Sequence, residues 1–175
     1  MTPAWIFPAY PLLILGPFAA KLAQHMDSSS GVDVIIGGFV FQGIGFLVSL
    51  MIYASYIYRL MTQKLPLETL RPAMFISVGP SAFTISGVVI MGHELPRLVP
   101  KDYLGNGELF AEISRVGSIW FGLWLWGLAL WFFIISVGAH WSVLSAKHKM
   151  PFAMTWYSYI FPNTGKSSQM HLYPE

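Results

Sequence analysis

The sequence predicts an all-α membrane protein with about four complete transmembrane helices and a partial fifth. Hydrophobic residues make up 55% of the 175 residues and charged residues only 10%, whereas a soluble domain carries about 25% charged residues. Charged residues are also absent from five long runs: 1–20, 34–58, 72–92, 116–146 and 150–165. A transmembrane helix needs about 20 predominantly apolar residues. Four runs reach that length and the fifth is shorter.

Five helices are expected in order along the chain, at about 3–22, 32–56, 72–92, 117–140 and 150–165. The fifth is called partial because 16 residues with a rise of about 1.5 Å each extend about 24 Å, less than a bilayer core of about 30 Å. Polar connections join the helices, and the longest is expected from Glu94 to Arg115. No second domain is indicated.

Prolines divide the five segments into two kinds. The first segment contains Pro8, Pro11 and Pro17, the third contains Pro80 and the fifth Pro162, whereas the second and fourth have none within the span. Proline removes a backbone hydrogen bond and bends a helix, and in a bilayer the freed carbonyl needs a neighbour or water. We therefore expect the first, third and fifth helices to be kinked and inside, with the straight helices outside against lipid. The alternative is that transmembrane helices simply tolerate proline.

Polar and small residues form stripes on two of the predicted helices. Ser77, Ser81 and Thr84 share one face of the third helix, and lining a pore and packing against another helix are equally favoured for them. On the second helix, a stripe of small and polar residues favours close packing; its members are Gly38, Gln42, Gly45 and Ser49. The fourth helix carries large aromatic side chains, including Trp120, Trp124 and Trp131. Side chains of this size favour an outer position in contact with lipid.

The charges weakly indicate an orientation and exclude some functions. The connections after the second and fourth helices hold five Lys/Arg, and those after the first and third hold four, so the positive-inside rule favours cytoplasmic placement of the former, with Met1 also inside. A net charge of +2 without a basic cluster argues against nucleic-acid binding. The chain has no cysteine and therefore no thiolate site. No cleavable signal peptide is expected.

The predicted helices contain no ionisable residue in their interiors, which disfavours a membrane enzyme. His93 and His140 are expected on opposite membrane faces, so they cannot share a metal or haem. The run from His93 to Arg97 begins like a zinc-protease helix but lacks the second histidine, and Pro96 is expected to break it. No cofactor or metal is expected. An uncharged interior lined by hydroxyls suits a path for anions that binds them weakly enough for release, unless charged helices lie outside this chain.

Three blocks, in order, resemble one family of membrane proteins. They are residues 1–14 (MTPAWIFPAYPLLI), 71–84 (RPAMFISVGPSAFT) and 156–165 (WYSYIFPNTG). The family is the tellurite-resistance/dicarboxylate transporter family, also called the voltage-dependent anion channel family, and within it the chain looks most similar to fungal malic acid (C4-dicarboxylate) transport proteins. Sulfite efflux pumps and plant slow anion channels belong to the same group.

The resemblance implies ten transmembrane helices, arranged as five hairpins around a pore, with kinked odd-numbered helices inside. The present segments resemble helices five to eight and the start of nine. It further implies a plasma-membrane transporter of small anions such as malate, a homotrimer, and a phenylalanine that plugs the pore. That residue looks like Phe161, for which the alternative is an ordinary packing aromatic. Sulfite export is the closest rival function.

The resemblance covers residues 1–165 and leaves 166–175 as a divergent polar tail. It spans about half of the family fold, so we expect a fragment of a transporter domain. Alone, such a fragment is expected to leave the polar face of the third helix towards lipid. The alternative is a truncated product with no transport activity of its own.

Overall fold

The computed structural model describes residues 3–145 and 154–160, apart from the side chains of 142–145 and 159. Its helices, in chain order, are the 3-10 helix η1 (Pro3–Ala9), α1 (Tyr10–Ala23), α2 (Ser28–Thr62), the 3-10 helix η2 (Glu68–Val78), α3 (Gly79–Leu98), the short η3 (Tyr103–Gly105), α4 (Gly107–Ser145) and η4 (Met154–Tyr159). The described residues include no strand. The all-α prediction is therefore confirmed.

Four helical stretches are long and apolar enough to cross a membrane: Pro3–Ala23, Ser28–Thr62, Glu68–Leu98 and Gly107–Trp141. They correspond to the four complete helices expected from the charge-free runs. Of the partial fifth helix, the structure describes η4 and Ile160.

The proline-containing spans are built differently from the other two. Each begins as a 3-10 helix and continues as an α-helix, and Pro11 and Pro80 lie in the first α-helical turn, where a missing N–H has no helical partner to lose. Pro8 lies inside η1 and Pro17 inside α1. By contrast, α2 and α4 are continuous over 35 and 39 residues. Pro162 lies outside the described residues.

The second, third and fourth spans extend further than the sequence analysis predicted, whereas the first, Pro3–Ala23, agrees with it. The connection expected from Glu94 to Arg115 shortens to the residues between Leu98 and Gly107. Absence of charge marks the part of a helix that crosses lipid, whereas the helix itself can continue into water, because Glu and Arg are good helix formers. Pro96 also does not break α3; it lies in the last turn, and the helix ends at Leu98.

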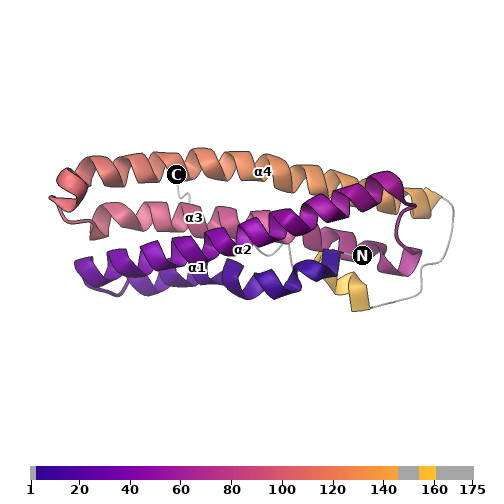
Figure 1. Ribbon diagram of the computed structural model, residues 1–175, viewed down its shortest axis with the longest axis horizontal. Helices are drawn as coiled ribbons and strands as arrows, with labels where there is room; N and C mark the ends of the chain where they lie inside the picture. Colours follow the sequence, from indigo (N-terminus) through magenta and orange to yellow (C-terminus); the bar gives the residue numbers. More distant parts are fainter. Residues whose placement is uncertain (1–2, 146–153, 161–175) are drawn as a thin grey trace.

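The helices pack as a three-helix group with a fourth helix added at one side (Figure 1). Helices α1, α2 and α3 each contact the other two, whereas α4 packs along α3 and η2. The third span is consequently the central one, and 67% of its most apolar window is buried, against 28% for α4. Two apolar clusters form the core, one around Tyr53 and Phe132 and the other around Val88 and Met91.

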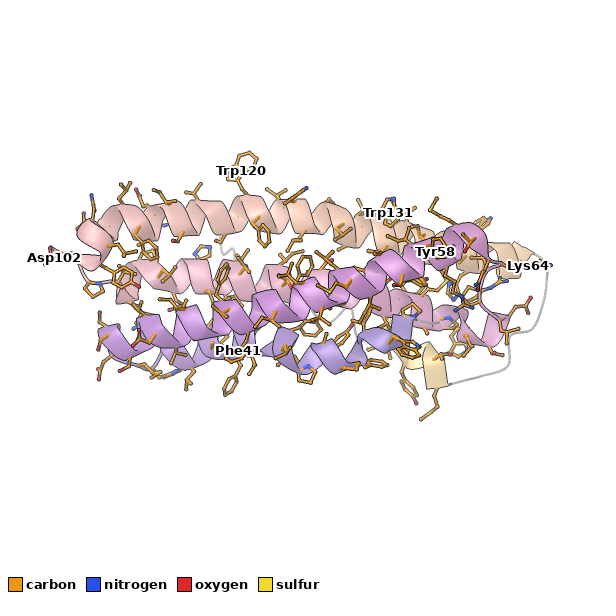
Figure 2. The ribbon with its side chains drawn as sticks, in the orientation of Figure 1. Phe41, Tyr58, Lys64, Asp102, Trp120 and Trp131 are labelled. Atoms are coloured by element: carbon orange, nitrogen blue, oxygen red, sulfur yellow. The ribbon has the colours of Figure 1, made fainter. Side chains whose placement is uncertain are left out.

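The outer faces of α2 and α4 carry large exposed apolar side chains (Figure 2). Trp120 on α4 points away from the bundle and is 71% exposed, and Phe41 on α2 and Trp131 on α4 are also exposed. A water-soluble surface rarely tolerates so large an apolar area. The first span also exposes large apolar side chains, among them Trp5, Phe7 and Phe18, so exposure alone does not separate the straight helices from this proline-containing one.

The small-residue stripe on α2 packs against α1, as the sequence favoured. All four members of the stripe are buried. At Gly38 an added Cβ would lie 2.3 Å from the Cβ of Ala19, and at Gly45 it would lie 2.9 Å from the Cβ of Leu12. The backbones approach closely because these positions carry no side chain, and the packing prediction is confirmed.

Candidate functional site

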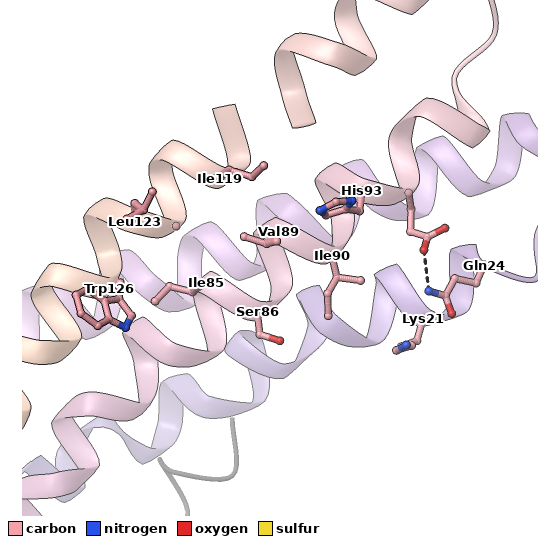
Figure 3. Close-up of a pocket in the computed structure, with 12 residues that line it drawn as sticks. Lys21, Gln24, Ile85, Ser86, Val89, Ile90, His93, Ile119, Leu123 and Trp126 are labelled. Atoms are coloured by element: carbon pink, nitrogen blue, oxygen red, sulfur yellow. Dashed lines mark hydrogen bonds between the residues drawn. The ribbon is translucent and has the colours of Figure 1, made fainter. Parts of the chain in front are cut away.

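A groove lies between α1, α3 and α4, and no residue of α2 lines it (Figure 3). Its volume is about 490 Å³. The groove forms because α4 contacts α3 but makes no extensive contact with α1. Its lining comes from α1 (Lys21, Gln24), α3 (Ile85, Ser86, Val89, Ile90, His93, Glu94) and α4 (Ile119, Gly122, Leu123, Trp126).

The inner part of this groove is apolar and uncharged. Branched aliphatic side chains of α3 and α4 form its walls, and Trp126 closes it on the α4 side. Ser86 supplies the one hydroxyl among the lining residues. A groove of this kind offers an ion no strong binding partner among its lining residues.

Charged and polar side chains gather at one mouth of the groove. The Gln24 amide nitrogen donates a hydrogen bond of 2.7 Å to the Glu94 carboxylate (Figure 3). Glu94 also forms an ion pair of 3.5 Å with Arg97 one turn later on α3. Arg97 in turn donates a 2.9 Å hydrogen bond to the carbonyl of Ala23. This network ties the end of α1 to the end of α3.

Lys21 gives this mouth its positive character. Its side chain is exposed in the last turn of α1, where a cation interacts favourably with the helix dipole. Among the described residues the ion pair of Glu94 is with Arg97 and none is found for Lys21. With the carboxylate engaged, the Lys21 ammonium group is available to attract anions to the mouth.

The predicted lining residues lie elsewhere, on the part of η2 and α3 that faces α2. Ser77 and Ser81 are 0% exposed and Thr84 is 2% exposed. Ser77 donates 2.6 Å to the Met74 carbonyl, and Thr84 donates 2.8 Å to the Pro80 carbonyl. The structure thus brings the three together in one buried region, but separates them from the groove. The expectation that this face points to lipid was wrong, because α2 covers it.

Helix α2 engages this polar face through two long side chains. Gln42 donates 3.0 Å to the Thr84 hydroxyl, and the Tyr53 hydroxyl donates to the carbonyl of Ser77. Gln42 occupies a recess where glycines replace side chains: a Cβ at Gly16 would lie 2.2 Å from its amide oxygen. That oxygen and the Ser81 hydroxyl have no hydrogen-bond partner among the described residues.

The two histidines lie far apart, as the sequence analysis expected. His93 is exposed at the charged mouth, near the hairpin that joins α3 to α4. His140 lies near the far end of α4, where it is buried against Phe75 at a ring distance of 5.4 Å. Its Nδ1 is 2.7 Å from the Ser136 carbonyl. Within the described residues, no group of three or more potential metal ligands occurs.

Sequence reasoning missed the groove residues Lys21, Ser86 and Trp126. One available signal was that Lys21 ends the first charge-free run while His93 and Glu94 follow the third. Successive antiparallel helices bring those two ends to the same side of the membrane. The proposed gate, Phe161, lies outside the described residues.

Sequence comparisons connect this chain to known proteins. A family model described as voltage-dependent anion channel matches residues 1–174. A malic acid transport protein of Schizosaccharomyces pombe is 30% identical over 164 residues, covering 94% of this chain and 37% of that protein. A second protein of the same organism, with a provisional malic acid transport name, is 25% identical over 163 residues, covering 93% of this chain and 37% of that protein.

A more distant relative, an uncharacterized transporter of Methanocaldococcus jannaschii, is 23% identical over 172 residues, covering 98% of this chain and 45% of that protein. The chain therefore spans less than half the length of the curated relatives it matches. No solved structure matches it.

Proposed function

Because the chain belongs to the voltage-dependent anion channel family, we propose that the full-length protein transports small organic anions of the malate or C4-dicarboxylate type across the plasma membrane. The observation that carries this proposal is the groove between α1, α3 and α4. Its inner part is uncharged, and one mouth carries Lys21 together with Glu94, whose carboxylate is paired with Arg97. A transporter that couples to cations usually carries ionisable groups within the membrane, whereas a path for anions does not require them.

In this proposal residues 1–165 form a partial transporter domain, and the groove is the part of the anion pathway that lies within it. Lys21 raises the local concentration of anions at the mouth, and the apolar walls keep binding weak enough for release. Phe161 is the proposed gate, Pro8, Pro11, Pro17, Pro80 and Pro162 are the proposed bends, and a homotrimer is the proposed assembly.

Ser77, Ser81 and Thr84 remain a second proposed lining. Since the hydroxyls of Ser77 and Thr84 are engaged in hydrogen bonds, Ser81 is the member of the three with a hydroxyl that has no partner among the described residues. For these residues to line a pathway, α2 must move away from α3.

The test is anion flux by the full-length protein in proteoliposomes, with radiolabelled malate as substrate and sulfite as competitor. We expect malate uptake above that of empty vesicles, inhibited by other C4-dicarboxylates and only weakly by sulfite. Sulfite flux without malate flux would replace the proposed substrate within the same family. No flux of either anion by a folded protein would contradict the proposal.

Phe161→Ala tests the gate in the same vesicles. Removing the ring is expected to increase the basal anion current, because the aromatic plug no longer narrows the pathway. Phe152→Ala, in the same apolar segment, is the matched control. An unchanged current at equal protein content would remove Phe161 from the proposed site.

A further inference from the structure

Glu94 places a carboxylate in the wall of the groove, at the mouth where Lys21 attracts anions. The Glu94 side chain is 18% exposed, and both residues belong to the groove lining. An uncompensated carboxylate in this position would repel an anion from the mouth to which Lys21 attracts it. The charge of Glu94 must therefore be offset if the mouth is to favour anions.

Arg97 supplies that compensation from outside the groove. Its Nε lies 3.5 Å from Oε2 of Glu94, and its Nη2 donates a 2.9 Å hydrogen bond to the carbonyl of Ala23. The second contact holds the guanidinium group at the C-terminal end of α1. Arg97 does not belong to the groove lining, so it acts on the groove through Glu94.

The two oxygens of the Glu94 carboxylate have different partners. Gln24 donates a 2.7 Å hydrogen bond to Oε1 (Figure 3), whereas Arg97 faces Oε2. Because the Gln24 amide is neutral, it orients the carboxylate without changing the charge at the mouth. The guanidinium group of Arg97 is the partner that neutralises the carboxylate.

The charge at the mouth follows from these contacts. Lys21 and Glu94 line the groove and Arg97 adjoins it, so two cations and one carboxylate leave the mouth with one positive charge. Without Arg97, the charges of Lys21 and Glu94 would cancel. Since an ion pair with a half-exposed arginine contributes little to stability, its main consequence is the electrostatic potential at the mouth.

We propose that Arg97 is a positioning residue that keeps the mouth of the groove attractive to anions, because it neutralises the Glu94 carboxylate. The inference rests on the proposed function, since it explains how an anion pathway has a carboxylate in its wall. It also makes the pair Glu94–Arg97, and not Lys21 alone, responsible for the charge that an arriving anion meets.

The experiment measures the electrostatic potential at the mouth with a reporter cysteine in the full-length protein, freed of any other cysteine. His93→Cys is the reporter, because His93 is exposed and lines the groove. The readout is the ratio of its reaction rates with an anionic and a cationic thiosulfonate of similar size. We expect Arg97→Gln to lower this ratio about fivefold at low ionic strength, and by less in high salt, because exposed charges are screened.

Substitution of Glu94 separates the effect of charge from that of structure. Glu94→Gln should raise the ratio about fivefold, and it keeps the guanidinium group and its acceptor on Ala23, so it tests the proposal even if Arg97→Gln does not fold. The double variant Glu94→Gln/Arg97→Gln should return the ratio close to the starting value, since Lys21 then supplies the one positive charge. Lys101→Gln, at an exposed cation in the turn after α3, is the matched control and should change the ratio little.

Three results would overturn the proposal. They are an unchanged ratio in Arg97→Gln and Glu94→Gln, a double variant that behaves like Arg97→Gln, and an equal fall of the ratio in Lys101→Gln. In variants without the reporter, the apparent KM for malate should rise in Arg97→Gln and recover in the double variant. If the unaltered protein carries no malate, the proposed function fails, whereas the labelling ratio still decides whether Arg97 sets the potential at the mouth.

Discussion

The two sides of α3 differ in how closely other helices pack against them. The side that faces α1 and α2 is tightly packed: glycines bring backbones into contact, and Gln42 bonds directly to Thr84. The side between α1 and α4 is open and forms an apolar groove with charge only at its mouth. In this molecule, the polar residues within the apolar spans therefore lie where helices pack together, whereas few polar residues line the open groove.

The physical reason is the low dielectric of the membrane. A hydroxyl or amide that faces lipid lacks partners, so it is stabilised by a hydrogen bond to another helix. On helix geometry, Ser86 in the groove lies about 200° around α3 from Thr84 at the packed interface. The two sides can consequently be altered independently, and four tests distinguish them.

The largest effect is expected at the contact between α1 and α2. In Gly38→Val the new Cβ would start 2.3 Å from that of Ala19, and overpacking of this kind costs about 1–3 kcal/mol. Gly37→Val is the matched control, because a Cβ there meets nothing within 4 Å. Thermal unfolding in detergent should show a clear loss for the first variant and little change for the second. Equal stability of the two would show that this interface is not closely packed.

Filling the groove should reduce transport without unfolding the protein. Ser86→Leu adds volume between α1 and α4 and is expected to lower malate flux about tenfold, because the width of a pathway limits what passes. Ser55→Leu, an equal change on the exposed face of α2, should leave the flux unaltered. The readout is uptake into proteoliposomes at matched protein content. Unimpaired flux in Ser86→Leu would place the pathway elsewhere.

The hydrogen bond between Gln42 and Thr84 should contribute a smaller amount. A double-mutant cycle of Gln42→Met and Thr84→Val is expected to give a coupling of about 0.6 kcal/mol in the unfolding free energy, as for other interhelical bonds in membranes. Ser49→Ala removes only a bond to Gly45 within α2 and serves as the control. Additive losses in the cycle would mean that the bond does not connect the helices.

The smallest effect is expected from a substitution of Lys21 at the mouth of the groove. Lys21→Gln should raise the apparent KM for malate about twofold to threefold at low ionic strength, since an exposed cation concentrates anions weakly and is screened by salt. The difference should disappear in high salt. Lys64→Gln, at the other end, is the comparison. A change in maximal rate rather than KM would give Lys21 a role inside the pathway.

Much of the fold could be predicted from the sequence, and the reasons are local. Charge-free length identified four spans, and the spacing of Gly38, Gln42 and Gly45 indicated close packing of α2. Helix ends could not be predicted from charge, because Glu94, Arg97 and Glu108 are compatible with helix outside lipid.

The groove could not be predicted for a different reason. It depends on which neighbours α3 has on each side, and a stripe such as Ser77, Ser81 and Thr84 has the same spacing whether it faces water or Gln42. Lys21, Gln24 and Glu94 meet only after α1 and α3 have packed. Tertiary packing therefore decides which polar residues are available to a solute.

Cysteine accessibility tests the central claim most directly, because the chain contains no cysteine of its own. Ser86→Cys and Ser81→Cys would be introduced singly into the full-length protein, freed of any other cysteine, and exposed to a membrane-impermeant thiosulfonate. If the anion pathway follows the groove, Ser86→Cys reacts readily, malate slows the reaction, and Ser81→Cys stays protected. Rapid, malate-sensitive labelling of Ser81→Cys with a protected Ser86→Cys would place the pathway on the α2 side of α3 and contradict the account.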